Sequence, residues 1–198
     1  MNTTESAAAV GAEFHEATRL LGLFAESEAP MRCAAAGLKI ARAIQAGGKV
    51  LACGNGGSAA DAMHFCEELT GRYRGNREPL PAIACSDVGH MTCVANDFGY
   101  QEVFGRWVRA LGTQDDVLIV LSTSGNSPNI RRAVDVAGEL GLTRVALLGR
   151  GGGAIAGTCE HEIIAPGETA DRIQELHMLA LHTMIGAIER CLGVAARD

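Results

Sequence analysis

Residues 49–73 read KVLACGNGGSAADAMHFCEELTGRY, and this stretch indicates the fold class. A short apolar run, 49–53, leads into a glycine-rich loop, 54–58, and residues 59–72 then read as a helix. A strand that is apolar throughout is buried on both faces, which is typical of a parallel sheet covered by helices. The stretch therefore predicts one strand-loop-helix unit of an α/β protein.

The alternation of strand and helix continues to the end of the chain. Further apolar strands are expected at 82–85, 117–121, 144–148 and 162–165, and helices at 88–95, 100–111, 128–140 and 170–192. Ahead of the first strand we expect two helices, the second over 31–46, with a break at Ala29-Pro30 and an end at Gly47-Gly48. We predict one domain over 1–198: an α/β, doubly wound, parallel five-stranded sheet flanked by helices, with an extra helical pair at 1–47.

The composition excludes several classes of protein. A formal net charge of −6 argues against a nucleic-acid-binding protein. The first residues show no signal-peptide pattern, and no apolar run is long enough to cross a bilayer. The seven cysteines include no C-x-x-C pair and are interpreted as reduced, with four expected in the core: Cys53, Cys66, Cys85 and Cys93. We therefore expect a cytoplasmic protein without nucleic-acid or membrane partners.

Two predicted strand ends carry loops that suit an anion. GNGGS at 54–58 and STSGNS at 122–127 each lead directly into a helix. Hydroxyl groups and free backbone N–H groups at a helix N-terminus bind phosphate without a lysine. A serine-rich capping turn is the alternative interpretation of 122–127. The first loop also fits the G-x-G-x-x-A dinucleotide pattern, but the acidic residue expected after the second strand is missing. Gly151-Gly152-Gly153 is interpreted as a plain turn.

A few side chains could move a proton. His64 and Glu68 are four residues apart and therefore share one face of a helix, which is compatible with a functional or a structural role. Asn96-Asp97 could contact a sugar hydroxyl or end a helix. The remaining histidines before the last one in the chain are interpreted as structural: His15, His90, His161 and His177.

The order of four segments carries a resemblance to a known family. GNGGSAADAMHFCEELTGRY, ANDFGY, STSGNS and ADRIQELHMLALH resemble the phosphoheptose isomerases of the sugar isomerase (SIS) family, from about Gly47 to the last helix. The resemblance implies an aldose–ketose isomerase that converts sedoheptulose 7-phosphate to D-glycero-D-manno-heptose 7-phosphate. Its product would serve bacterial heptose biosynthesis, for the lipopolysaccharide core or another surface glycan. The loop departs from the family pattern at Ser58-Ala59-Ala60, without an expected consequence.

The resemblance also implies roles for individual residues. Glu68 would be the catalytic base and His182 the acid. The residues implied to line the sugar-phosphate site are Asn55, Gly56, Gly57, Glu68, Asn96, Asp97, Ser122, Thr123, Ser124, Ser127 and Gln174. One zinc ion per subunit is implied, with the ligands His64, Glu68, Gln174 and His182.

Helix geometry adds an expectation about assembly. Gln174 and His182 are eight residues apart, which is ~12 Å along one regular helix. Ligands of one zinc ion cannot be so far apart unless long side chains converge sharply, so we expect Gln174 and His182 of one site to belong to different chains, with sites at subunit interfaces. We extend this expectation to Glu68 and His182 of one site, which mixing two inactive variants would test. The resemblance implies a homotetramer, with the helical pair at 1–47 used for oligomerisation.

Two other functions are alternatives to an isomerase. One is a non-catalytic SIS-fold adaptor that binds a replication initiator protein, and its known examples lack the glutamate and the final histidine. The other is a sugar-phosphate-sensing regulatory domain.

Overall fold

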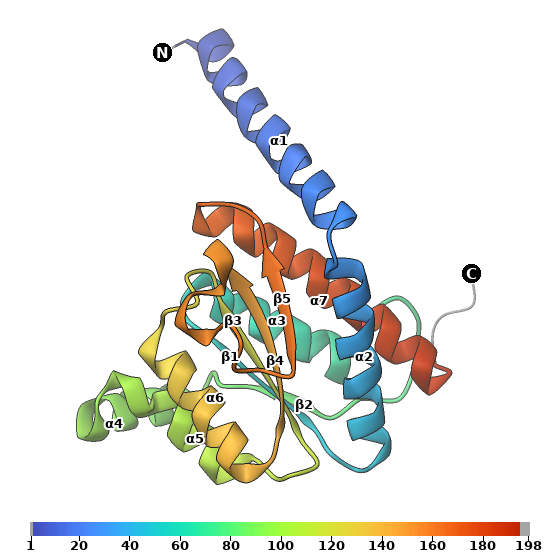
Figure 1. The fold of residues 1–198 in the computed structure, drawn as a ribbon, viewed down its shortest axis with the longest axis vertical. Helices are drawn as coiled ribbons and strands as arrows, with labels where there is room; N and C mark the ends of the chain where they lie inside the picture. Colours follow the sequence, from blue (N-terminus) through green and yellow to red (C-terminus); the bar gives the residue numbers. More distant parts are fainter. Residues whose placement is uncertain (1, 195–198) are drawn as a thin grey trace.

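A computed structural model describes residues 2–194, which contain one parallel five-stranded sheet with the strand order β2-β1-β3-β4-β5 (Figure 1). The strands are β1 (Val50–Gly54), β2 (Ala82–Ala84), β3 (Val117–Ser122), β4 (Thr143–Gly149) and β5 (His161–Ala165). The helices are α1 (Thr3–Glu26), α2 (Ala29–Gln45), α3 (Gly57–Thr70), α4 (Val88–Phe98), α5 (Val103–Leu111), α6 (Pro128–Leu140) and α7 (Ala170–Leu192), with short 3₁₀ segments η1 (Tyr100–Glu102) and η2 (Arg150–Ile155). The predicted fold class is therefore confirmed.

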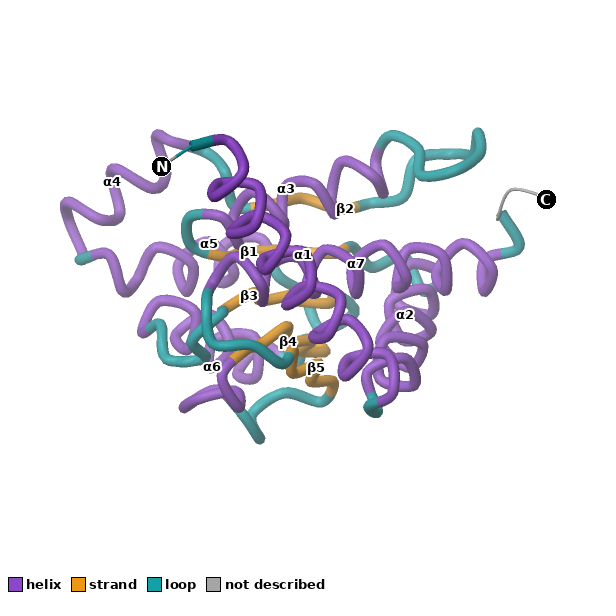
Figure 2. The backbone as a smooth tube through the Cα atoms, turned by 90° about the horizontal axis from the view of Figure 1, so that it is seen from above, coloured by secondary structure: helices purple, strands orange, loops and turns teal. Residues whose placement is uncertain are grey.

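Helices cover both faces of the sheet (Figure 2). Alternate residues of β3 point to opposite sides, so that Val117, Ile119 and Leu121 pack in one core with α2, α3 and α7. Leu118 and Val120 pack in the other core with α4, α5 and α6. Every residue of β3 is buried, as expected of a central parallel strand.

The strand order places two loops side by side. β1 and β3 are neighbours, with Gly54 opposite Leu121 at their carboxyl ends. The chain leaves β1 towards α3 on one face and leaves β3 towards α6 on the other. Such a switch point opens a crevice in which ligands of doubly wound folds bind. Both loops singled out in the sequence lie at this crevice.

The N-terminal helix α1 projects away from the sheet and its covering helices (Figure 1). Of its residues, Leu20 and Phe24 near its end are buried. The break between α1 and α2 lies at Ser27-Glu28 rather than at Ala29-Pro30. Proline is tolerated in the first turn of a helix, where its missing N–H would have had no helical partner.

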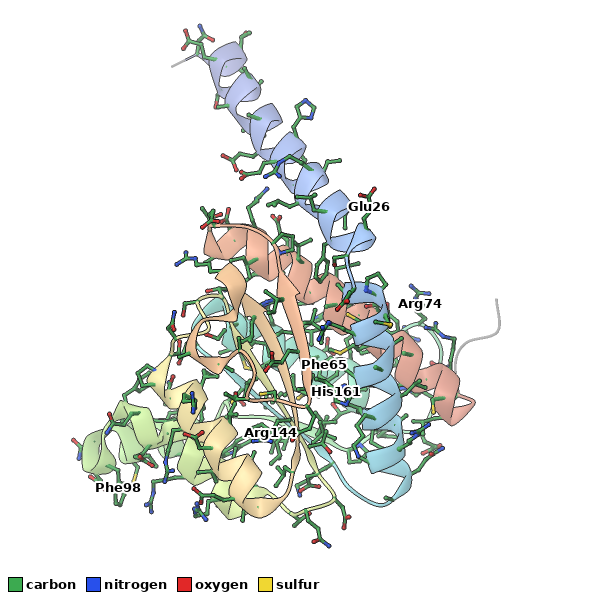
Figure 3. The ribbon with its side chains drawn as sticks, viewed as in Figure 1. Glu26, Phe65, Arg74, Phe98, Arg144 and His161 are labelled. Carbon is green, nitrogen blue, oxygen red and sulfur yellow. The ribbon has the colours of Figure 1, made fainter. Side chains whose placement is uncertain are left out.

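Two further expectations differ from the structure. The prediction that Cys93 lies in the core is wrong, because Cys93 is exposed and the next residue, Val94, is the buried residue of α4. The segment predicted as one helix over 100–111 divides into η1 and α5. At the end of α4, Phe98 is exposed (Figure 3) and lies under the guanidinium group of Arg106.

No helix among residues 2–194 is both long and apolar enough to cross a membrane.

Candidate active site

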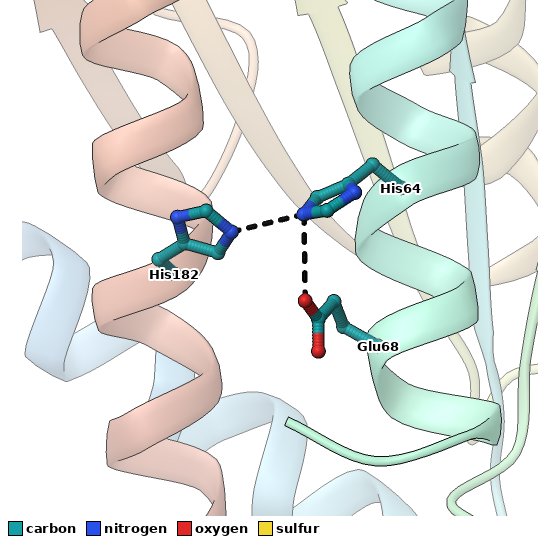
Figure 4. Close-up of side chains that lie close together, drawn as sticks. All are labelled: His64, Glu68 and His182. Carbon is teal, nitrogen blue, oxygen red and sulfur yellow. Dashed lines mark hydrogen bonds and ion pairs between the residues drawn. The ribbon is translucent and has the colours of Figure 1, made fainter. Parts of the chain in front are cut away.

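Two helices on the same face of the sheet, α3 and α7, bring three ionisable side chains together (Figure 4). His64 and Glu68 lie one turn apart on α3, with 3.5 Å between His64 Nε2 and Glu68 Oε1. His182 projects from α7, and its Nε2 lies 2.9 Å from His64 Nε2. One nitrogen of each imidazole and one carboxylate oxygen all lie within 4.8 Å of one another. The three side chains are partly exposed, so a small molecule can reach them.

The meeting of these side chains corrects one expectation. The prediction that Glu68 and His182 of one site come from different chains is wrong, because a single chain brings them into one cluster. Gln174 and His182 do lie on one continuous helix, ~12 Å apart along its axis. Within one chain, His182 is therefore close to Glu68 of α3 but far from Gln174 of its own helix.

The surroundings of His182 keep its imidazole neutral. Its ring stacks on Tyr73, with 5.7 Å between the ring centroids and 22° between the planes. Burial lowers the pKa of His182 below its ordinary value, and the nearby His64 lowers it further, while Glu68 opposes the shift. At pH 7 the ring therefore has a free nitrogen lone pair, which can accept a proton or bind a metal ion.

The three side chains have a donor set that fits zinc. Two imidazoles and one carboxylate are typical of zinc sites that keep a fourth position open. Two nitrogens bound to one tetrahedral zinc ion lie ~3.3 Å apart, close to the 2.9 Å that separates the two Nε2 atoms here. Glu67 Oε1 lies 3.3 Å from Nδ1 of His64. A carboxylate at that position favours the tautomer whose Nε2 is free to bind a metal ion.

The serine-rich loop between β3 and α6 combines a turn with open donors. Ser122 is buried, and its hydroxyl oxygen accepts a hydrogen bond from the N–H of Gly125 at 3.1 Å. The hydroxyl oxygen of Ser124 accepts one from the N–H of Asn126 at 3.2 Å. Both hydroxyl groups act as acceptors in these contacts, so their hydrogens can still be donated to an anion. Ser127, at the N-cap of α6, makes no capping hydrogen bond with its side chain.

The glycine segment 151–153 supports this loop, so the interpretation as a plain turn was incomplete. Gly125 and Gly152 both have positive φ, +63° and +88°, and a Cβ at Gly125 would lie 2.0 Å from the carbonyl oxygen of Gly152. The N–H of Ile155 donates to the carbonyl oxygen of Gly125 at 3.1 Å. The N–H of Ala154 donates to Oδ1 of Asn126 at 2.9 Å. The backbone of η2 thus sets the position of the serine-rich loop.

Comparison with known proteins identifies the family. The SIS domain family model matches residues 14–149. The phosphoheptose isomerase of Fusobacterium nucleatum is 53% identical over 154 residues, which are 78% of this chain and 79% of that protein. The chain belongs to the phosphoheptose isomerase family. The enzyme of Enterobacter sp. is 49% identical over 180 residues, 90% of this chain and 94% of that protein. The solved structure of the phosphoheptose isomerase from Neisseria gonorrhoeae is 39% identical and matches with a TM-score of 0.85, covering 93% of this chain and 98% of that one. The family recognised in the sequence is confirmed.

In this member of the phosphoheptose isomerase family, the other predicted site residues lie in two places. The amide of Gln174 packs on the first turn of α3, where a Cβ at Gly57 would lie 2.5 Å from Nε2 of Gln174. Gln174 is thus beside the glycine-rich loop rather than beside the His64, Glu68 and His182 cluster. Asn96 and Asp97 are exposed on α4, where Nδ2 of Asn96 donates to Oδ1 of Asp97 at 2.7 Å. Their contact with a sugar stays a prediction.

Sequence reasoning missed two residues that link the loops of this phosphoheptose isomerase family member. Asn129 is buried at the start of α6 and exchanges two amide hydrogen bonds with Asn55, at 2.9 and 2.8 Å. The hydroxyl of Tyr100 donates to Oδ1 of Asn55 at 3.0 Å. These side chains and Ser127 border a hollow of about 380 Å³ at the crevice. A polar residue two positions after the serine-rich loop was the available signal for Asn129.

Proposed function

We propose that this chain isomerises sedoheptulose 7-phosphate to D-glycero-D-manno-heptose 7-phosphate, the activity that the resemblance implied. The observation that carries the proposal is the meeting of His64, Glu68 and His182 within one chain. The carboxylate of Glu68 supplies the base that an aldose–ketose isomerisation needs, and the imidazole of His182 can take up and pass on the protons of the two oxygens near neutral pH. Those SIS-fold adaptors that lack the glutamate and the final histidine could not offer this pair.

The chemistry follows from these two side chains. The carboxylate of Glu68, whose side chain is 16% exposed, takes the proton from C1 of the ketose while the carbonyl oxygen on C2 gains one. The resulting enediol then loses the proton on the C1 oxygen and regains a proton at C2 from Glu68. His182 exchanges the protons of the two oxygens, which its lowered pKa allows near neutral pH. Atoms and charge balance over the two transfers.

We propose zinc as the metal of this site, with His64, Glu68 and His182 as the ligands that this chain supplies. When bound, zinc polarises the carbonyl group as a Lewis acid and favours the oxyanion. The assignment is supported by the two imidazoles and the carboxylate, a set that suits zinc better than magnesium.

The phosphate of the sugar is proposed to bind at the serine-rich loop. The hydroxyl groups of Ser122 and Ser124 and the N-terminus of α6 are the available donors, with Thr123 and Ser127 beside them. A phosphate held there keeps the reacting carbons in place without taking part in the proton transfer.

Assembly into a homotetramer is proposed from α1 and from Gln174. Phe14 on α1 is 70% exposed, and Val10 and Leu21 on the same helix are also exposed, which suits packing against another copy. Because Gln174 lies ~12 Å along α7 from His182, it can join the metal site only from a neighbouring chain.

The seven cysteines are free, in agreement with a reducing compartment such as the cytoplasm. We propose that the product serves a surface glycan such as the lipopolysaccharide core.

Replacement of Glu68 tests the proposed function. Glu68→Gln keeps the size of the side chain but removes the base, so turnover of sedoheptulose 7-phosphate should fall at least ~10²-fold while the melting temperature stays unchanged. Glu139→Gln is the matched control, because Glu139 is an exposed glutamate on α6, which covers the face of the sheet opposite to α3 and α7. Turnover of Glu68→Gln within a few-fold of the unchanged protein would remove Glu68 from the mechanism.

A further inference from the structure

A strap without helix or strand, residues 71–81, joins α3 to β2 and carries a buried ion pair. Nε of Arg77 lies 2.7 Å from Oε1 of Glu189 on α7, and the two side chains are 2% and 3% exposed. The partners are 112 residues apart in the sequence, so this contact exists only through the fold. A charged pair this deeply buried needs an explanation, because burying two charges costs about as much as their attraction returns.

The guanidinium group of Arg77 also closes the end of α3. Its Nη2 donates to the carbonyl oxygen of Glu68 at 2.6 Å, and its Nη1 donates to that of Leu69 at 2.7 Å. The last carbonyl groups of a helix have no partner within the helix and carry its negative end. Arg77 therefore holds the backbone of Glu68 itself.

The same guanidinium group reaches the helix that carries His182. Glu189 is seven residues after His182, two turns along the same side of α7. One side chain thus fixes α3 at Glu68 and α7 near His182. The strap adds a third contact, because Tyr73 stacks on the ring of His182 and Arg74, labelled in Figure 3, lies over the ring of Tyr73.

We propose that Arg77 is a positioning residue, which sets the distance between His64 and Glu68 on α3 and His182 on α7. The inference deepens the proposed function, because it concerns the same site. Apolar contacts alone let two helices slide by fractions of an ångström, whereas a planar guanidinium whose three nitrogens hold different partners on α3 and α7 fixes both direction and distance. A misplacement of about 1 Å can lower a rate by about 10²-fold.

The test removes the pair without leaving a buried charge. In the double variant Arg77→Met/Glu189→Leu, apolar side chains of similar volume replace both partners, a change that is often neutral for stability. Because Met cannot replace the hydrogen bonds to the carbonyl oxygens of Glu68 and Leu69, we expect some loss of melting temperature, which a destabilised control variant must match. We expect kcat to fall about 10- to 100-fold, with little change in KM, because the hydrogen bonds of Arg77 go to α3, α7 and its own strap rather than to the serine-rich loop. The dissociation constant for zinc, measured by competition with a chromophoric chelator and no substrate, should rise by a similar factor.

Two further variants separate positioning from stability. Arg77→Lys keeps the charge but lacks the planar fork, so it should restore little of kcat or of zinc affinity, and it serves alone if the double variant does not fold. Val136→Ala destabilises the opposite core and should change neither quantity. The proposal is overturned if the Arg77 variants keep the original kcat and zinc affinity, or if Val136→Ala lowers both as much at an equal loss of melting temperature.

The spectra of the two imidazoles give a readout that needs neither substrate nor metal. In ¹⁵N-histidine-labelled protein, the contact between His64 Nε2 and His182 Nε2 should be lost in the Arg77 variants, with shifts in both rings. Unchanged imidazole signals would contradict the positioning role. If the protein has no isomerase activity but these signals still shift, the proposed function fails and the role of Arg77 stands.

Discussion

Acid should destabilise this protein through His177, a residue outside the proposed chemistry. His177 is fully buried on α7, and its Nε2 donates to the carbonyl oxygen of Leu148 on β4 at 3.0 Å. Its Nδ1 has no hydrogen-bond partner among residues 2–194. A proton on Nδ1 would therefore be a buried charge without an acceptor, and burial lowers the pKa of His177 to about 4 from its ordinary 6.5.

The proton uptake of His177 in the folded and unfolded chains sets the sign and the size of the change in unfolding free energy with pH. The unfolded chain takes up the proton near pH 6.5 and the folded chain only near pH 4, so stability falls as the pH drops through this window. The difference between the two pKa values corresponds to about 3 kcal/mol in total. About 2 kcal/mol of it should be lost between pH 7 and pH 5.

The matched variant is His177→Gln, which does not titrate but keeps an N–H that can reach Leu148. Urea unfolding would be followed at pH 7, 6 and 5, at one protein concentration and with a chelator present, so that neither assembly nor metal binding changes. The unchanged protein should lose about 2 kcal/mol more unfolding free energy than the variant over this range. Parallel losses in the two proteins would refute the argument that His177 is held neutral by burial.

Three other predictions concern the proposed site. Ser124→Ala and Ser122→Ala should each raise KM for the phosphorylated sugar about 10-fold and leave kcat nearly unchanged, because one charge-assisted hydrogen bond to the phosphate is lost. The control Ser6→Ala on α1 should change neither KM nor kcat, and equal KM values in all three variants would mean that the loop is only a capping turn. Extended chelation should lower activity, and zinc should restore it better than magnesium; full activity in protein shown to be metal-free by elemental analysis would exclude a metal requirement. Refolded mixtures of Glu68→Gln and His182→Ala should remain inactive because one chain supplies both residues, whereas mixtures of Glu68→Gln and Gln174→Ala should regain activity. The reverse pattern would show that Glu68 shares a chain with Gln174 and not with His182.

Local patterns in the sequence were enough to predict the sheet and the two loops. The strands are short and buried on both faces, so their apolar runs stand out, and the helices between them indicate parallel connections. The shared face of His64 and Glu68 also follows from the helical repeat alone. Each of these features depends on residues within a few positions of one another.

The remaining features depend on contacts between distant segments. Which turn of α7 faces His64 is decided by the packing of α3 on α7, and for that reason the expectation of separate chains for Glu68 and His182 failed. The pairs Asn55 with Asn129 and Arg77 with Glu189 join residues 74 and 112 positions apart. No periodicity or spacing marks such partners, because a buried polar residue reveals its partner only in the folded chain.

Product analysis with the purified chain and sedoheptulose 7-phosphate is the decisive measurement of the proposed function. The protein, loaded with zinc, would be incubated with sedoheptulose 7-phosphate, with Glu68→Gln as the inactive control. We expect D-glycero-D-manno-heptose 7-phosphate, identified by NMR, to form at least ~10² times faster than with the control. No aldoheptose phosphate above the control, from folded protein, would contradict the proposed function and favour the non-catalytic adaptor.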